Sequence, residues 1–128
     1  MTASERARTL AIAAAAAASE KKASAIVALD VSEHMVLTDV FLVVSGQNER
    51  QVAAIVDAVE ERLHAEGAKA VRREGLTQAR WVLLDFGDIV VHVQHEEDRA
   101  YYALERLWRD CPVIDLPAAV VDSGEGES

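Results

Sequence analysis

Residues 81–108, WVLLDFGDIVVHVQHEEDRAYYALERLW, decide how this chain folds. Two apolar, β-branched runs at 81–85 and 89–93 predict a pair of strands. Gly87 lies between them and can adopt the positive φ that a tight hairpin turn needs. A helix is expected at 97–109, because acidic residues suit the N-terminus of a helix and Pro112 prevents its continuation. The stretch therefore predicts strand, turn, strand and helix.

The region upstream predicts a strand, a helix and a short edge strand. Residues 40–44 (VFLVV) are apolar throughout, which is typical of a strand covered on both faces. Asn48 and Gln51 fit a capping box, and a stripe of apolar residues at helical spacing follows: Val52, Ile55, Val56, Val59 and Leu63. Gly67 is a natural end for this helix. The charges within 69–72 would protect an exposed sheet edge.

The N-terminal segment 4–19 has two interpretations. Its alanine run follows two arginines, an outline shared with secretory signal peptides. A helix is the favoured interpretation, because alanine is the best helix former and Ser4 can cap the start. A strand at 25–31 is expected next. The mass of the purified chain separates the two interpretations, because cleavage would remove the helix.

The predicted element order is α-β-β-α-β-β-β-α. The strand–helix–strand portion at 40–72 predicts a right-handed crossover, and the later strands should be antiparallel. We therefore expect a single α/β domain with a mixed sheet flanked by helices. The domain should cover 1–117, with its first helix at 4–19 and its core at 23–112. The polar, acidic tail at 118–128 is expected to be disordered.

Charge and cysteine usage restrict the class of partner and the compartment. The 22 acidic residues outnumber the 13 basic ones, giving a net charge of -9. Such a field repels phosphate backbones, so little direct nucleic-acid binding is expected, and it favours basic partners. No apolar run reaches the roughly 20 residues that a membrane span needs. A lone cysteine, Cys111, suits the reducing cytoplasm and predicts a partly buried thiol.

No pattern predicts a catalytic, metal or cofactor site. Asp85 and Asp88 are the best candidates for paired carboxylates that bind Mg²⁺, but aspartate is common beside turns for backbone reasons. His92 and His95 should point to opposite faces of a strand, and His92 is expected to be a hydrogen-bonded core histidine. A metal-dependent nucleotidyltransferase-like enzyme that uses Asp39, Asp85 or Asp88 stays open as an alternative.

Trp81 is the residue whose role the pattern leaves open. It begins a strand directly after a polar loop. Tryptophan is enriched among binding hot spots, and it also fills cores. Trp81 is therefore either a core residue or an anchor for a partner.

Two blocks of the chain resemble the ribosomal silencing factor family, also called Iojap-like. The first is TDVFLVVSG at 38–46, continuing through Arg50-Gln51-Val52. The second contains 81–85, 87–88 and 90–93, and then Glu97, Arg99, Tyr101, Tyr102, Leu104, Glu105, Leu107 and Trp108. The resemblance covers about 10–112. It departs at Gln94-His95, where many relatives carry an apolar or aromatic residue.

This resemblance implies a degenerate nucleotidyltransferase-like fold without enzymatic activity. It also implies binding to the large ribosomal subunit through ribosomal protein fourteen (uL14). That binding blocks joining of the small subunit and represses translation when nutrients are scarce, and free members are often homodimers. On this basis Trp81 and Val82 should anchor the interface, with Asp85, Glu74 and Arg80 as its polar rim. A generic dimeric adaptor without a ribosomal role is the remaining alternative.

Overall fold

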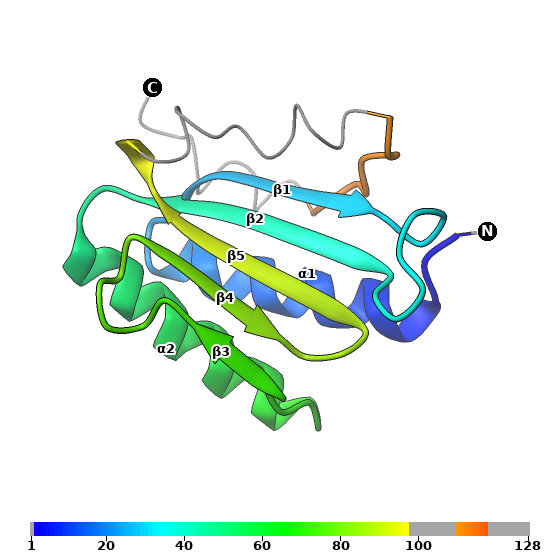
Figure 1. The fold of residues 1–128 in the computed structure, drawn as a ribbon, viewed down its shortest axis with the longest axis horizontal. Helices are drawn as coiled ribbons and strands as arrows, with labels where there is room; N and C mark the ends of the chain where they lie inside the picture. The colour runs from blue at the N-terminus through cyan, green and yellow to red at the C-terminus, as the bar shows by residue number, and fades with distance from the viewer. Residues whose placement is uncertain (1, 98–109, 118–128) are drawn as a thin grey trace.

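A computed structural model describes residues 2–97 and 110–117 of the chain. Five strands form one mixed sheet in the order β1-β2-β5-β4-β3, and two helices pack on one of its faces (Figure 1). The elements are α1 Glu5–Glu20, β1 Ser24–Asp30, β2 Val40–Gly46, α2 Glu49–Ala65, β3 Arg72–Glu74, β4 Trp81–Asp85 and β5 Ile89–His95. The predicted α/β class and the order of these seven elements are confirmed. The predicted helix at 97–109 beyond its first residue, and the tail at 118–128, lie outside the described residues.

Both helices start where side-chain chemistry predicts. The side chains of Ser4 and Asn48 accept hydrogen bonds of 3.0 Å and 2.8 Å from the backbone N–H groups three residues later. The capping box of α2 differs in one detail. The Gln51 side chain accepts from the N–H of Gln47 at 2.6 Å, one residue before the cap. This contact ties the residue before the cap to the first turn of the helix.

The alanine-rich helix α1 is an integral part of the core. One side of it is buried almost completely: Ala7, Leu10, Ala11, Ala14, Ala15, Ala17 and Ala18. Small side chains allow α1 to pack closely against α2 and the central strand β2. Removal of this segment would uncover apolar surface on both neighbours. Within the described ranges, no helix combines the length and apolar character that a membrane span requires.

Strands β2 and β5 form the parallel centre of the sheet. They pair from Val40 with Ile89 to Gly46 with His95. This pairing extends both strands beyond the predicted ends, because the terminal residues of each strand pair with those of the other. β1 is antiparallel to β2, β4 is antiparallel to β5, and β3 is antiparallel to β4. β3 therefore runs parallel to β2 with two strands between them, so the connection through α2 is a crossover.

The edge strand β3 begins three residues later than predicted. The sequence predicted a strand at 69–72, whereas the pairing starts with Arg72 opposite Asp85 and ends with Glu74 opposite Leu83. The partner strand β4 sets this register, and the charges at 69–72 carry no information about it. The predicted protection of this edge by charge is retained, because all three residues of β3 are exposed and charged.

The two faces of the sheet bury different sets of side chains. The face that carries α1 and α2, called the helix face, buries Leu42, Val82, Leu84, Val91 and other residues of the main core. The other side, called the opposite face, carries a smaller buried cluster: Leu29, Val31, Phe41, Val90 and Cys111. The Cys111 thiol is free and buried, and burial raises its pKa. The sequence predicted a partly buried thiol, and the structure buries it more completely.

Candidate protein-binding site

Strand β4 divides its side chains between the two faces of the sheet. Val82 and Leu84 are 1% and 0% exposed and belong to the core on the helix face. Trp81, Leu83 and Asp85 alternate with them, lie on the opposite face and are each partly exposed. A strand with one buried and one partly open face presents every second residue to a partner. The accessible set is therefore Trp81, Leu83 and Asp85.

The indole of Trp81 is held by a buried histidine. Its Nε1–H donates to Nδ1 of His92 at 3.3 Å, and the two ring centroids are 6.4 Å apart. His92 in turn meets the ring of Phe41 edge-on, with centroids 5.0 Å apart. The three rings come from β4, β5 and β2 and form a continuous row across the opposite face. His92 is thus the hydrogen-bonded core histidine that the sequence predicted.

The charged residues beside this row come from β3 and from the end of β4. Arg72 lies opposite Asp85 in the sheet and Glu74 lies opposite Leu83, so both β3 residues share the face of β4 that carries Trp81. The Arg72 guanidinium is 3.4 Å from the Glu74 carboxylate and 3.9 Å from that of Asp85. Exposed ion pairs of this kind typically contribute 0 to about 1 kcal/mol. The three charges can therefore exchange partners at low cost.

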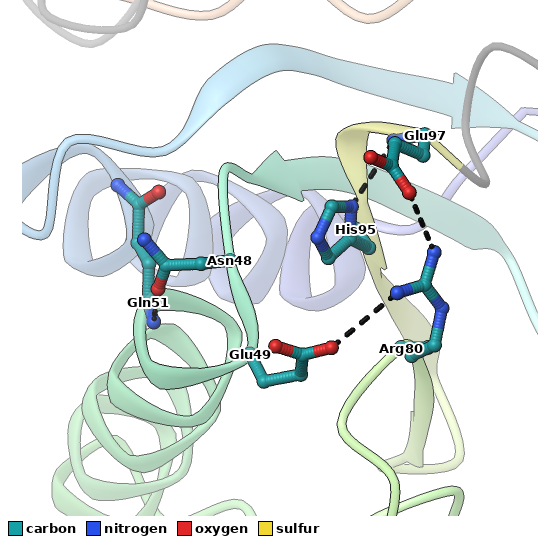
Figure 2. Close-up of polar contacts among 6 residues, drawn as sticks. All are labelled: Asn48, Glu49, Gln51, Arg80, His95 and Glu97. Carbon is teal, nitrogen blue, oxygen red and sulfur yellow. Dashed lines mark hydrogen bonds and ion pairs between the residues drawn. The ribbon is translucent and has the colours of Figure 1, made fainter.

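Arg80 makes a different set of contacts from these rim charges. Figure 2 shows its guanidinium between two carboxylates, 3.3 Å from Glu49 at the start of α2 and 3.1 Å from Glu97 after β5. The backbone N–H of His95 donates to the carbonyl of Arg80 at 2.7 Å. The Nδ1 atom of His95 accepts from the N–H of Glu97 at 3.2 Å. Arg80 therefore connects the start of β4 to the end of β5 and to α2.

The structure brings together only part of the predicted interface. Trp81, Asp85 and Glu74 share the opposite face, whereas Val82 is buried against the helices and Arg80 is engaged by Glu49 and Glu97. Leu83 was missed, although period-two alternation from Trp81 was enough to find it. Arg72 was also missed, and its place beside Asp85 follows only from the pairing of β3 with β4.

Two of the carboxylates considered for metal or proton chemistry, Asp39 and Asp85, have backbone partners. An Asp39 carboxylate oxygen accepts from the N–H of Ser4 at 2.9 Å, and one of Asp85 accepts from the N–H of Gly87 at 2.8 Å. The second contact is the turn geometry that accounts for an aspartate at this position. Among residues 2–97 and 110–117, no group of three histidine, cysteine or acidic side chains could hold a metal ion.

Gly46, at the end of β2, has a packing role. A Cβ atom there would lie 3.0 Å from a methyl group of Val52 and 3.1 Å from its backbone nitrogen. The turn between β2 and α2 therefore needs a residue without a side chain in order to bring the helix close to the strand. This packing requirement accounts for a glycine at position 46.

Comparison with known proteins identifies the family. The chain matches the family described as "Ribosomal silencing factor during starvation" over residues 4–127. It is 44% identical to "Ribosomal silencing factor RsfS" of Bacillus subtilis, over 80% of this chain and 87% of that protein. It is 43% identical to the protein of the same name from Halalkalibacterium halodurans, over 81% of this chain and 89% of that one.

A solved structure shows the same fold. The crystal structure of a protein from Chromobacterium violaceum has a TM-score of 0.76 and 32% identity, covering 94% of this chain and 97% of that chain. The family match spans nearly the whole chain, and both of these bacterial relatives carry the name of the same family. The chain therefore belongs to the ribosomal silencing factor family.

Proposed function

We propose that this protein binds the large ribosomal subunit through ribosomal protein fourteen and thereby blocks joining of the small subunit. Translation would be repressed when nutrients are limited, without any chemical transformation by the bound protein. Membership of the ribosomal silencing factor family is the observation that carries the proposal. The action is steric and takes place in the cytoplasm.

The opposite face of β4 supplies a surface suited to such docking. Trp81 and Leu83 provide a partly exposed apolar centre, and Arg72, Glu74 and Asp85 provide charges around it. An apolar or aromatic centre with a polar rim is the usual anatomy of a protein interface. Val82 packs against the core on the helix face of β4, and Arg80 forms ion pairs at the start of this strand. We therefore propose that these two residues hold the docking strand in place.

The charge of the chain favours a basic partner. A net charge of -9 attracts positively charged ribosomal proteins and repels exposed ribosomal RNA. The charge would mainly raise the association rate, and the Trp81 anchor would mainly set the lifetime of the complex. We therefore place the contact on a protein of the large subunit.

A sucrose-gradient profile tests the proposed activity. Ribosomal subunits are mixed under joining conditions with increasing amounts of the purified protein. We expect joined ribosomes to decrease and free subunits to accumulate, with the protein in the large-subunit fraction. Unchanged joining at saturating protein, or sedimentation with the small subunit, would contradict the proposal.

Replacement of Trp81 with alanine tests the anchor. Loss of a central tryptophan typically costs about 2 kcal/mol or more, so the variant should bind large subunits about thirtyfold more weakly. Val36→Ala is a matched control, because Val36 is 96% exposed in the loop between β1 and β2. Equal co-sedimentation of the Trp81 variant and the parent protein would remove Trp81 from the interface.

We also propose that the free protein forms a homodimer through the same apolar centre. Light scattering after gel filtration would then report a dimer for the parent chain and a monomer for Trp81→Ala. A dimer that persists in this variant would place the self-association elsewhere. Competition between dimerisation and ribosome binding follows only if both involve Trp81.

A further inference from the structure

His92 lies at the centre of the sheet beneath the candidate docking strand. It is 6% exposed on β5, with Val43 of β2 and Leu83 of β4 as its lateral neighbours. Its Nδ1 atom accepts the indole hydrogen bond of Trp81, and Phe41 packs edge-on against the imidazole. A buried side chain thus accepts a hydrogen bond from the partly exposed ring beside it.

The hydrogen-bonding state of His92 is determined by this contact. Burial lowers the pKa of His92 to about 4, so the imidazole is neutral at pH 7. Since Nδ1 accepts a hydrogen bond, the ring hydrogen is on Nε2. Nε2 is buried, and within the described ranges it has no hydrogen-bond partner. Such a donor destabilises a fold, and an apolar residue of similar volume would avoid the penalty.

Stability therefore does not account for a histidine at this position, whereas a role in docking does. We propose, on the basis of the function proposed above, that His92 is a positioning residue that orients the Trp81 indole for the ribosomal partner. The hydrogen bond limits rotation of the ring before the partner arrives. Restricting a side chain to its bound orientation reduces the entropy lost on association.

Two substitutions of His92 separate positioning from packing. His92→Leu removes the acceptor and keeps an apolar side chain of similar volume. His92→Asn can place its side-chain oxygen near the position of Nδ1 and so retain an acceptor. We expect the leucine variant to bind large subunits about three- to tenfold more weakly, the effect of one net hydrogen bond. Its melting temperature should equal or exceed that of the parent, and the asparagine variant should recover most of the binding.

The donor side of the contact gives an independent measurement. Trp81→Phe keeps an aromatic ring but removes the indole N–H. If the hydrogen bond is the relevant contact, this change and His92→Leu should not add in the double variant. In a Trp108→Phe background, Trp81 is the sole tryptophan. Its indole N–H resonance should shift, and its hydrogen exchange should accelerate, when leucine replaces His92.

The outcomes distinguish this inference from the proposed function. Parent-like binding by His92→Leu, with weak binding by Trp81→Ala, would overturn the positioning role and leave the docking proposal intact. Parent-like binding by Trp81→Ala would overturn the docking proposal itself. If the leucine and asparagine variants lose stability and binding together, His92 is structural. If the leucine variant does not fold, Trp81→Phe and His92→Asn still test the positioning role. The first variant retains an aromatic ring at the contact, and the second retains a hydrogen-bond acceptor.

Discussion

At the scale of single residues, the candidate site depends on a few polar atoms in an apolar sheet. His92 accepts from Trp81, while both side-chain polar atoms of Gln94, two residues further along, are buried without partners among the described residues. Buried polar groups of this kind reduce the stability of a domain. His92 and Gln94 on the opposite face of β5 are therefore not the residues that packing alone would favour.

His92 should make the stability of the protein depend on pH. Its pKa is lowered from 6.5 to about 4 in the folded state, so the unfolded state binds the proton more readily. Stability should be complete above about pH 6.5 and fall progressively as the pH decreases toward 4. The limiting loss is on the order of 3 kcal/mol, at about 1.4 kcal/mol for each pKa unit.

Urea unfolding between pH 7.5 and pH 4.5 measures this dependence. The control is His92→Leu, whose unfolding free energy should decrease less over the same interval because the titrating group is gone. Parallel pH profiles for the parent and the variant would show that His92 does not titrate differently in the folded and unfolded states.

At the scale of elements, the first turn of helix α2 makes hydrogen bonds and an ion pair to several neighbouring segments. Asn48 caps the helix, and the Gln51 amide donates at 3.0 Å to the carbonyls of Lys21 and Lys22 in the turn after α1. Glu49, also in this first turn, pairs with Arg80 at the start of β4 (Figure 2). The first turn of α2 therefore connects both helices with the docking strand.

Removal of the α2 cap should lower stability by a predictable amount. Asn48→Ala is expected to cost about 1 kcal/mol, because the N–H of Gln51 loses its acceptor. Asn48→Asp is the matched control, since aspartate caps helices equally well and suits the helix dipole. Chemical denaturation should place the aspartate variant within a few tenths of a kcal/mol of the parent. Equal loss in both variants would show that the cap hydrogen bond is not the stabilising contact.

At the scale of the whole molecule, the acidic charge should govern the rate of ribosome binding. The net charge of -9 produces an electric field that attracts basic partners. Salt screens this field, with a Debye length of about 10 Å at 0.1 M ionic strength. Raising the salt concentration from 50 to 300 mM should lower the association rate several-fold and change the dissociation rate much less. Trp81→Ala should show the reverse pattern, with a faster dissociation rate.

Stopped-flow binding to labelled large subunits resolves the two rates. The Val36→Ala control should follow the parent at every salt concentration. An association rate that does not change with salt would contradict electrostatic attraction as the source of the encounter.

The sequence by itself determined the elements of this protein. The Ser4 and Asn48 caps, the alanine helix, the apolar strand at 40–44 and the hairpin at Gly87 each depend on residues close together in the chain. Capping residues and hydrophobic periodicity can be recognised in the sequence without tertiary information. Period-two alternation along β4 likewise separates two sets of side chains. Trp81, Leu83 and Asp85 lie on one face of the sheet, and Val82 and Leu84 lie on the other.

Only the tertiary structure decided how these elements combine. The insertion of β5 between β2 and β4, the register of β3 and the meeting of Trp81 with His92 all depend on pairing between distant segments. Arg80 shows the same limit, because a charged residue before a strand gives no sign that its partners are Glu49 and Glu97. The physical reason is that sheet pairing is selected by burial and hydrogen bonding summed over the whole domain. A local pattern specifies a strand, but not its neighbour.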